Sequence, residues 1–110
     1  ELEQLIESEQ IHKGITATAG GFYGPQGRVL RLGIQDSALN SKMDSFSFEG
    51  HRITNIEMET SAIYGLGKLL GHHCLSMNAI IANRANGTFS QDPYKAVDEL
   101  ILYTLNKLAQ

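Results

Sequence analysis

The sequence predicts an α/β fold in which a layered sheet is flanked by helices, because strand-like and helical segments alternate along the chain. Residues 14–19 (GITATA) and 52–58 are expected to be strands, the first of small alternating residues. Residues 59–70 and 93–108 are expected to be helices. The chain has 110 residues, of which 42% are hydrophobic, enough for one globular core and one domain at most.

The first ten residues predict a helix, since Leu2, Leu5 and Ile6 fall on one helical face. No capping residue precedes Glu1, so we expect this segment to be the end of a helix already under way. Residues 37–49 are expected to form a further helix.

Helix-capping residues mark the helix ends in the second half of the chain. Gly71 ends the helix of residues 59–70, as glycine does at left-handed C-caps. Asp92 followed by Pro93 supplies an N-cap and a first helical residue for the last helix. Between the two helices, residues 74–82 are expected to form a buried strand.

Composition excludes several classes of function. Nine Lys plus Arg against twelve Asp plus Glu give a formal charge of −3, without the basic excess that nucleic-acid binding requires. No apolar run approaches a membrane span, and the acidic start is unlike a signal peptide. The single Cys74 cannot form an internal disulfide, and no Cys/His cluster has zinc-ligand spacing. We therefore expect a cytoplasmic protein with no nucleic-acid partner, no membrane partner and no metal.

Two glutamates stand where the second strand becomes a helix. Residues two apart in an extended segment point to the same side, so Glu57 and Glu59 are expected to face one cleft while Met58 faces away or offers its backbone. Such a pair of carboxylates can accept hydrogen bonds from adjacent hydroxyls, as on a sugar. The alternative is that Glu59 complements the helix dipole and Glu57 is solvated. The strand-to-helix position favours a ligand site, since ligands bind there in open α/β sheets.

A second candidate site lies in the glycine-rich loop GGFYGPQGR, residues 20–28. Four glycines and a proline predict unusual backbone angles. Phe22 supplies an aromatic face, Gln26 an amide and Arg28 a permanent cation, which suit a planar base with imide edges. The alternative is that Phe22 fills the core and Arg28 is a surface charge.

Considered together, GFYGPQGR, NIEMETSAIYGL and the later AIIANR resemble the C-terminal half of the nucleoside phosphorylase family, most closely its uridine phosphorylase branch. The order, spacing and residue types agree at all three places. The resemblance runs from about Lys13 onward and implies a layered mixed sheet flanked by helices. Residues 1–110 are then the C-terminal part of a single nucleoside phosphorylase-like domain, a fragment that lacks the family's phosphate-binding glycine and arginines.

The resemblance also implies a role for each motif residue. Phe22 would stack beside the base or sugar, while Gln26 and Arg28 bind the uracil edge. Arg84 would fix the region of those two side chains. The full set implied to bind the base is Phe22, Gln26, Arg28, Ile80, Ile81 and Arg84, the two isoleucines lining its apolar side.

The E-M-E motif implies the ribose site, with the carboxylates of Glu57 and Glu59 on the hydroxyls and Met58 packed on the sugar. The implied catalytic residues are Arg28, which stabilises the anionic base, and Glu59 on the ribose side. Purine-specific relatives place an aspartate near Asn83, so asparagine here favours a pyrimidine.

The implied reaction is phosphorolysis of uridine or a related pyrimidine nucleoside to uracil and ribose 1-phosphate. Inorganic phosphate is the co-substrate, and no organic cofactor or metal is needed. Two alternatives stay open: a purine nucleoside phosphorylase or nucleosidase, and a non-catalytic nucleoside-binding or structural domain. Family members assemble as dimers packed into larger rings, so the resemblance also implies a homo-oligomer.

Overall fold

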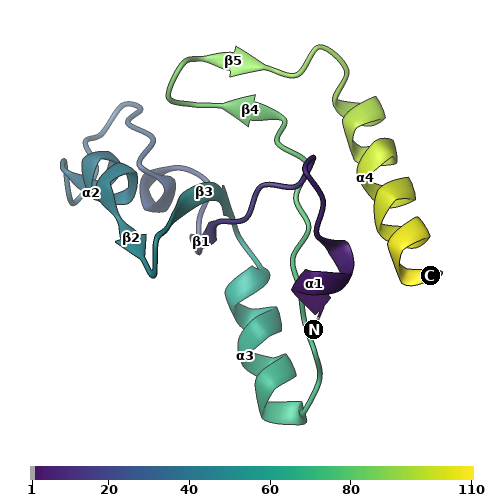
Figure 1. The fold of residues 1–110 in the computed structure, drawn as a ribbon. Helices are drawn as coiled ribbons and strands as arrows, with labels where there is room; N and C mark the ends of the chain where they lie inside the picture. The colour runs from purple at the N-terminus through teal and green to yellow at the C-terminus, as the bar shows by residue number, and fades with distance from the viewer. Residues whose placement is uncertain (1) are drawn as a thin grey trace. The chain divides into compact units, whose positions relative to one another are not determined.

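The computed structural model describes residues 2–110, which divide into two compact units (Figure 1). One unit, His12–Cys74, contains a three-stranded sheet with helices. The other joins the chain up to Ile11 with Leu75–Gln110 and contains two helices and a short hairpin. A mixed sheet flanked by helices confirms the predicted α/β class.

The three-stranded sheet has the order β1-β3-β2, with β1 at Ile15–Thr18, β2 at Ser47–Phe48 and β3 at His51–Glu57. β1 runs parallel to β3, whereas β2 is antiparallel to it, so the sheet is mixed. Glu49 and Gly50 join β2 to β3 with φ angles of 48° and 79°. Two successive left-handed residues make the tight hairpin turn that fits the twist of the strands.

The parallel ladder of β1 and β3 contains one irregularity. Ile15 pairs with Ile53 and Thr16 pairs with Asn55, so β3 carries one extra residue, Thr54, between them. Gly14 lies beside this residue, and a Cβ on Gly14 would overlap the side chain of Thr54. The absence of a side chain at Gly14 therefore gives Thr54 its space.

Helix α3 (Thr60–Leu70) follows β3 almost directly and ends as predicted at Gly71, which has a φ of 76°. The N–H of His72 donates to the carbonyl of Gly67 at 2.8 Å and closes this end of the helix. Gly67 is buried because the sulfur of Cys74 packs against it, and a Cβ there would overlap Sγ.

The prediction of a buried strand over residues 74–82 is wrong. Regular pairing begins only at β4 (Ala82–Asn83), which forms an antiparallel hairpin with β5 (Thr88–Phe89). The apolar run from Cys74 is half-buried in part, but within residues 2–110 no neighbouring strand pairs with residues 74–81. An apolar run becomes a strand only where a neighbour satisfies its N–H and C=O groups.

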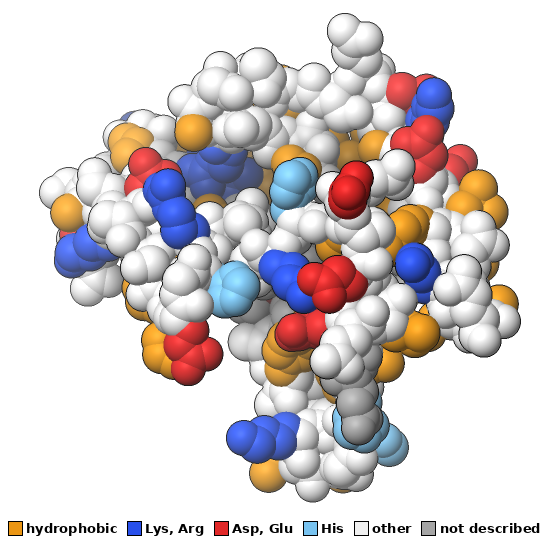
Figure 2. Space-filling model, in the orientation of Figure 1, with side chains coloured by type: hydrophobic (Ala, Val, Ile, Leu, Met, Phe, Trp, Pro, Cys, Tyr) orange, Lys and Arg blue, Asp and Glu red, His pale blue; other side chains and the backbone are white. Residues whose placement is uncertain are grey.

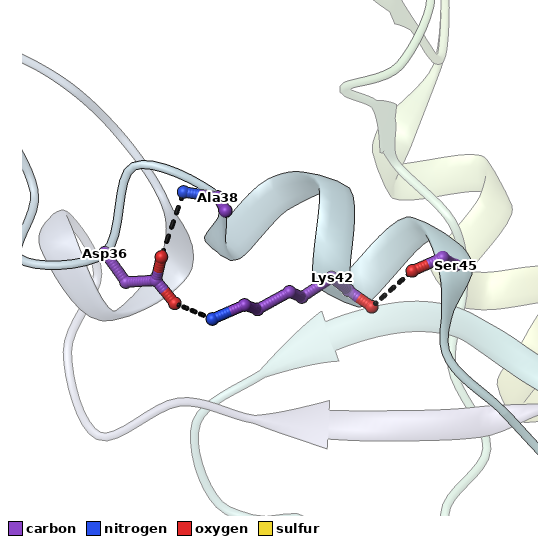
Figure 3. A network of polar contacts seen from close by, with 4 residues as sticks. All are labelled: Asp36, Ala38, Lys42 and Ser45. Atoms are coloured by element: carbon purple, nitrogen blue, oxygen red, sulfur yellow. Dashed lines mark hydrogen bonds and ion pairs between the residues drawn. The ribbon is translucent and has the colours of Figure 1, made fainter.

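Helix α2 (Leu39–Ser45) is shorter than the predicted 37–49. Asp36 precedes it and accepts hydrogen bonds from the N–H of Ala38 at 3.0 Å and from Nζ of Lys42 at 2.7 Å (Figure 3). The bond from Lys42, followed by that from Ala38, lowers the pKa of Asp36. At the other end Phe46 is extended, with φ −67° and ψ 133°, because the next two residues pair with β3.

The other unit contains α1 (Leu2–Ile6) and α4 (Pro93–Leu108). The predicted cap of α4 is confirmed, since Oδ1 of Asp92 accepts from the N–H of Lys95 at 3.0 Å. The hydroxyl of Tyr103 on α4 donates to the carbonyl of Ile6 and lies 3.0 Å from Oγ of Ser8. These bonds hold α1 against α4. Neither helix, nor any other among residues 2–110, has the length and hydropathy needed to cross a membrane.

Burial is shallow throughout the described residues. Ile6 is the one hydrophobic side chain among residues 2–110 that is buried, with 8% of its surface exposed. Figure 2 shows hydrophobic side chains at many points of the visible surface. Large exposed ones on α3 and α4 include Leu66, Leu69, Leu70, Tyr94, Leu102 and Leu105.

Candidate functional site

Both motif segments of the first unit leave the same edge of its sheet. β1 and β3 are parallel, and Thr18 pairs with Glu57 at their last residues. The N–H of Ala19 donates to the carbonyl of Glu57 at 2.8 Å and extends the pairing by one residue. The loop of residues 20–28 therefore starts beside the E-M-E segment, at the carboxyl ends of parallel strands where α/β sheets bind ligands.

Glu57 uses its carboxylate within the protein. Oε1 accepts from the hydroxyl of Thr18 at 2.5 Å, and Oε2 accepts from the backbone N–H groups of Glu59 and Thr60, each at 2.7 Å. Glu57 is half-buried, so the alternative of a simply solvated side chain is wrong. This carboxylate joins the end of β3 to the start of α3.

The hydrogen bonds to Glu57 set its ionisation. Desolvation by burial raises the pKa of Glu57, but the bonds from Thr18, from the amides of Glu59 and Thr60 and from the Thr60 side chain outweigh it and lower the pKa to about 2. The carboxylate therefore stays charged at neutral pH while it accepts the first amide N–H groups of α3.

Glu59 lies in a different environment. The strand expected to reach Met58 ends at Glu57, and Glu59 has φ −129° and ψ −27° as the N-cap of α3. The prediction that an extended backbone places Glu57 and Glu59 on the same side is therefore wrong, because the backbone at Glu59 is not extended. Glu59 is exposed and makes no side-chain cap bond, and its carboxylate contacts no donor among residues 2–110. Met58 beside it is 39% exposed.

The structure brings Phe22, Gln26 and Arg28 together in the loop. Nη1 of Arg28 donates to the carbonyl of Phe22 and to Oε1 of Gln26. The guanidinium carbon lies 3.9 Å from the centroid of the Phe22 ring, a cation–π contact. Tyr23 meets the same ring edge to face at 5.2 Å and 89°. The three predicted base-binding residues of this loop are thus one cluster.

The cluster contradicts the alternative in which Phe22 fills the core and Arg28 is a free surface charge. Phe22 is 52% exposed, so it does not fill a core, and Arg28 is half-buried and bonded rather than a free surface charge. Gln26 is 5% exposed, and its amide oxygen already accepts from Arg28. The Phe22 ring thus contacts both the guanidinium of Arg28 and the ring of Tyr23.

The backbone of this loop follows from its glycines and from α2. Residues Gly24–Gln26 form a 3-10 turn, and Gly27 ends it with φ 72°. The amide Nδ2 of Asn40 donates to the carbonyl of Gly27 at 3.0 Å. α2 therefore supports the turn that places Gln26 and Arg28.

Ile80, Ile81 and Arg84 belong to the other unit. Ile80 is 57% exposed, and the carbonyl of Ile81 accepts from the N–H of Ser90 at 2.7 Å, next to the β4–β5 hairpin. Arg84 lies in the turn of that hairpin, directly after Asn83. Their place beside the base stays a prediction.

Sequence reasoning missed Thr18 and Asn40. Both act through hydrogen bonds to partners that are distant in sequence, Thr18 to Glu57 across 39 residues and Asn40 to Gly27 across 13. The one available signal for Thr18 was its position as the last polar residue of a strand that ends beside the loop. Among residues 2–110 no three His, Cys, Asp or Glu side chains are grouped as a metal site would need.

Comparison with known proteins adds one result to this geometry. Searches among curated proteins and among solved structures found no match. A family model described as the phosphorylase superfamily matches residues 1–109, nearly the whole chain. The predicted resemblance is thereby confirmed at the level of the family, and the chain belongs to the phosphorylase superfamily of nucleoside phosphorylases.

Proposed function

We propose that this protein is a nucleoside phosphorylase acting on uridine or a related pyrimidine nucleoside. Its family supplies the reaction class, the transfer of a pentosyl group from a nucleoside. The observation that carries the proposal is the common sheet edge: Thr18 and Glu57 end paired strands, so the base-binding loop and the ribose-binding segment begin side by side. Asn83 in place of an acid supports a pyrimidine rather than a purine.

On the base side, cleavage of the N-glycosidic bond leaves negative charge on the departing ring. Arg28 does not deprotonate at working pH, so it stabilises that charge electrostatically rather than by donating a proton. The bonds of Arg28 to Phe22 and Gln26 both use Nη1, and a guanidinium carries five N–H donors in all. The cluster therefore holds the cation in a fixed orientation beside the Phe22 ring.

On the ribose side, the exposed carboxylate of Glu59 accepts the sugar hydroxyls, and its charge stabilises the cationic ring that forms as the bond breaks. Met58 packs on the sugar. Glu57 holds the backbone of Glu59 in place through its N–H. Inorganic phosphate attacks the anomeric carbon, and the products are ribose 1-phosphate and uracil, without an organic cofactor or metal.

The test is release of uracil from uridine by the complete gene product, with and without phosphate, alongside the 110-residue chain alone. We expect phosphate-dependent release by the complete protein and none by the chain alone. Water-driven release would indicate a nucleosidase instead, and release from inosine alone a purine enzyme. Nucleoside binding without turnover would replace the proposal with a binding domain.

The proposal includes the assembly and location that the family resemblance implies. We expect a cytoplasmic homo-oligomer, either a dimer or a ring of dimers. Sedimentation of the complete protein at working concentration checks the assembly, and a monomer with full activity would contradict it.

A further inference from the structure

The hydroxyl of Thr18, at the end of β1, forms hydrogen bonds with a residue before Glu59 and with a residue after it. Thr18 Oγ1 donates to Oε1 of Glu57 at 2.5 Å and accepts from the N–H of Ser61 at 3.0 Å. The other oxygen of Glu57 accepts from the N–H groups of Glu59 and Thr60. Thr18 and Glu57 therefore bind three successive backbone N–H groups at the start of α3.

Because of this arrangement, the side chain of Glu59 does not have to accept a hydrogen bond from the first helical turn, as an N-cap side chain usually does. The side chain of an N-cap residue ordinarily accepts from an N–H of the first helical turn, which it must face to do so. In α3 the N-cap is Glu59, but Glu57 and Thr18 accept from Thr60 and Ser61 in its place. The carboxylate of Glu59 is thus left for another partner while its backbone is fixed.

We infer that Thr18 is a positioning residue for ribose recognition, holding Glu57 and the start of α3 so that the carboxylate of Glu59 faces the sugar. The inference rests on the proposed function. Thr18 touches neither base nor sugar in this assignment. It works by being donor and acceptor at once, which serine reproduces and valine does not.

Another threonine in the same strand serves as a control for a purely structural role of Thr18. Thr16 lies two residues earlier, and its hydroxyl also donates across the ladder, to Oδ1 of Asn55 at 2.8 Å. Its partner lies within β3, and no bond from Thr16 reaches residues 57–61. Thr16→Val therefore removes a similar cross-strand hydrogen bond without touching the segment of Glu59.

The experiment compares Thr18→Val, Thr18→Ser and Thr16→Val in the complete protein. The readouts are KM and kcat for uridine, inhibition by free uracil, and hydrogen exchange of the Ser61 amide. We expect Thr18→Val to raise KM on the order of ten-fold, the effect of losing a hydrogen bond to a charged group. Inhibition by uracil stays unchanged because the base loop is untouched, and exchange at Ser61 becomes faster. Thr18→Ser restores both values, and Thr16→Val changes neither.

Several results would overturn the inference. One is an active wild type in which Thr18→Val behaves like Thr16→Val in both KM and exchange. Another is equal loss of uridine and uracil binding, which would show general damage rather than lost ribose contact. If the wild-type protein cleaves neither uridine nor inosine, the proposed function is wrong. This inference then fails with it, before any variant is compared.

Discussion

The side-chain amide of Asn40 donates to the carbonyl of Gly27 at 3.0 Å and so links α2 to the turn between Gln26 and Arg28. Gly27 has φ 72°, a conformation that side chains rarely adopt, and a Cβ there would overlap Asn40 itself. The turn therefore depends on a residue without a side chain and on a partner packed directly against it.

Gly27→Ala is expected to damage both stability and base binding. The left-handed backbone and the overlap with Asn40 together lower the free energy of unfolding by about 1–3 kcal/mol, the range for strained backbone positions. KM for uridine rises because Gln26 and Arg28 flank the altered residue. Urea unfolding and steady-state kinetics measure the two effects.

Gly50→Ala is the matched control for this prediction. Gly50 also has a positive φ, 79°, but a Cβ there meets nothing within 4 Å, and the residue lies in the β2–β3 turn. It should lose stability through backbone strain alone and keep the wild-type KM. Equal KM values for the two variants would contradict the role given to the Gly27 turn.

Arg28→Ala is expected to lower turnover strongly, on the order of 2.7 to 4 kcal/mol, if its loss resembles that of an oxyanion donor. Arg28→Lys keeps the charge but loses the planar contact with Phe22 and the geometry of the two bonds from Nη1, so an intermediate rate is expected. Arg31→Ala is the control, since Arg31 is exposed in the following segment. An unchanged kcat in Arg28→Ala would remove this residue from the site.

Glu59→Gln is expected to weaken nucleoside binding and leave free uracil binding nearly intact, because the base loop does not contain Glu59. The amide keeps the size of the side chain but loses the charge and one acceptor. Isothermal titration with uridine and with uracil separates the two cases. Comparable losses for both ligands would rule out the assignment of Glu59 to ribose.

Glu57 is expected to make stability depend on pH in the acid range. Its pKa is lowered from 4.5 to about 2 in the folded protein, so its contribution is complete above pH 4.5 and is lost as the pH falls toward about 2. Urea unfolding of wild type and Glu57→Gln at several pH values across this range measures it, and the stability difference should shrink as the pH falls. Asp36 also has a lowered pKa but is present in both proteins, so its effect cancels.

A constant difference between the two proteins across that range would contradict the ionic role of Glu57. Thr18→Val offers an independent check. It removes one of the bonds that lower the pKa of Glu57, so the acid transition should move to higher pH.

Sequence reasoning succeeded where neighbouring residues decide the structure. Gly71 and Asp92 mark helix ends through contacts within a few residues, and both ends lie where they were predicted. The α/β class and the family followed from alternation and from three motifs in a fixed order. Helix ends depend on neighbouring residues, and the fold class and family depend on the order of segments along the chain. Both can therefore be predicted without knowing how the segments pack.

The failures involve distant partners. Residues 74–82 have the composition of a buried strand, but no strand of the described chain pairs with residues 74–81. The internal hydrogen bonds of Glu57 were not predicted, because one of its partners, Thr18, lies 39 residues away. The three residues Phe22, Gln26 and Arg28 were correctly predicted to act as a group. The bond of Arg28 to Gln26 and its stacking on Phe22 could not be predicted, because they depend on the folded turn.

The extra residue in β3 decides which residue of β3 lies opposite Thr18, at the end of the sheet that carries the candidate site. If the pairing of Ile15 with Ile53 continued residue for residue, Thr18 would lie opposite Ile56, whose side chain accepts no hydrogen bond. Thr54 shifts the ladder by one, and Glu57 arrives opposite the hydroxyl instead. A single-residue deletion inside this strand would leave every letter of the E-M-E motif in place and still separate it from Thr18. A related sequence can therefore contain the E-M-E motif and still lack the contact between Thr18 and Glu57. The length of the strand distinguishes a relative that has this contact from one that lacks it.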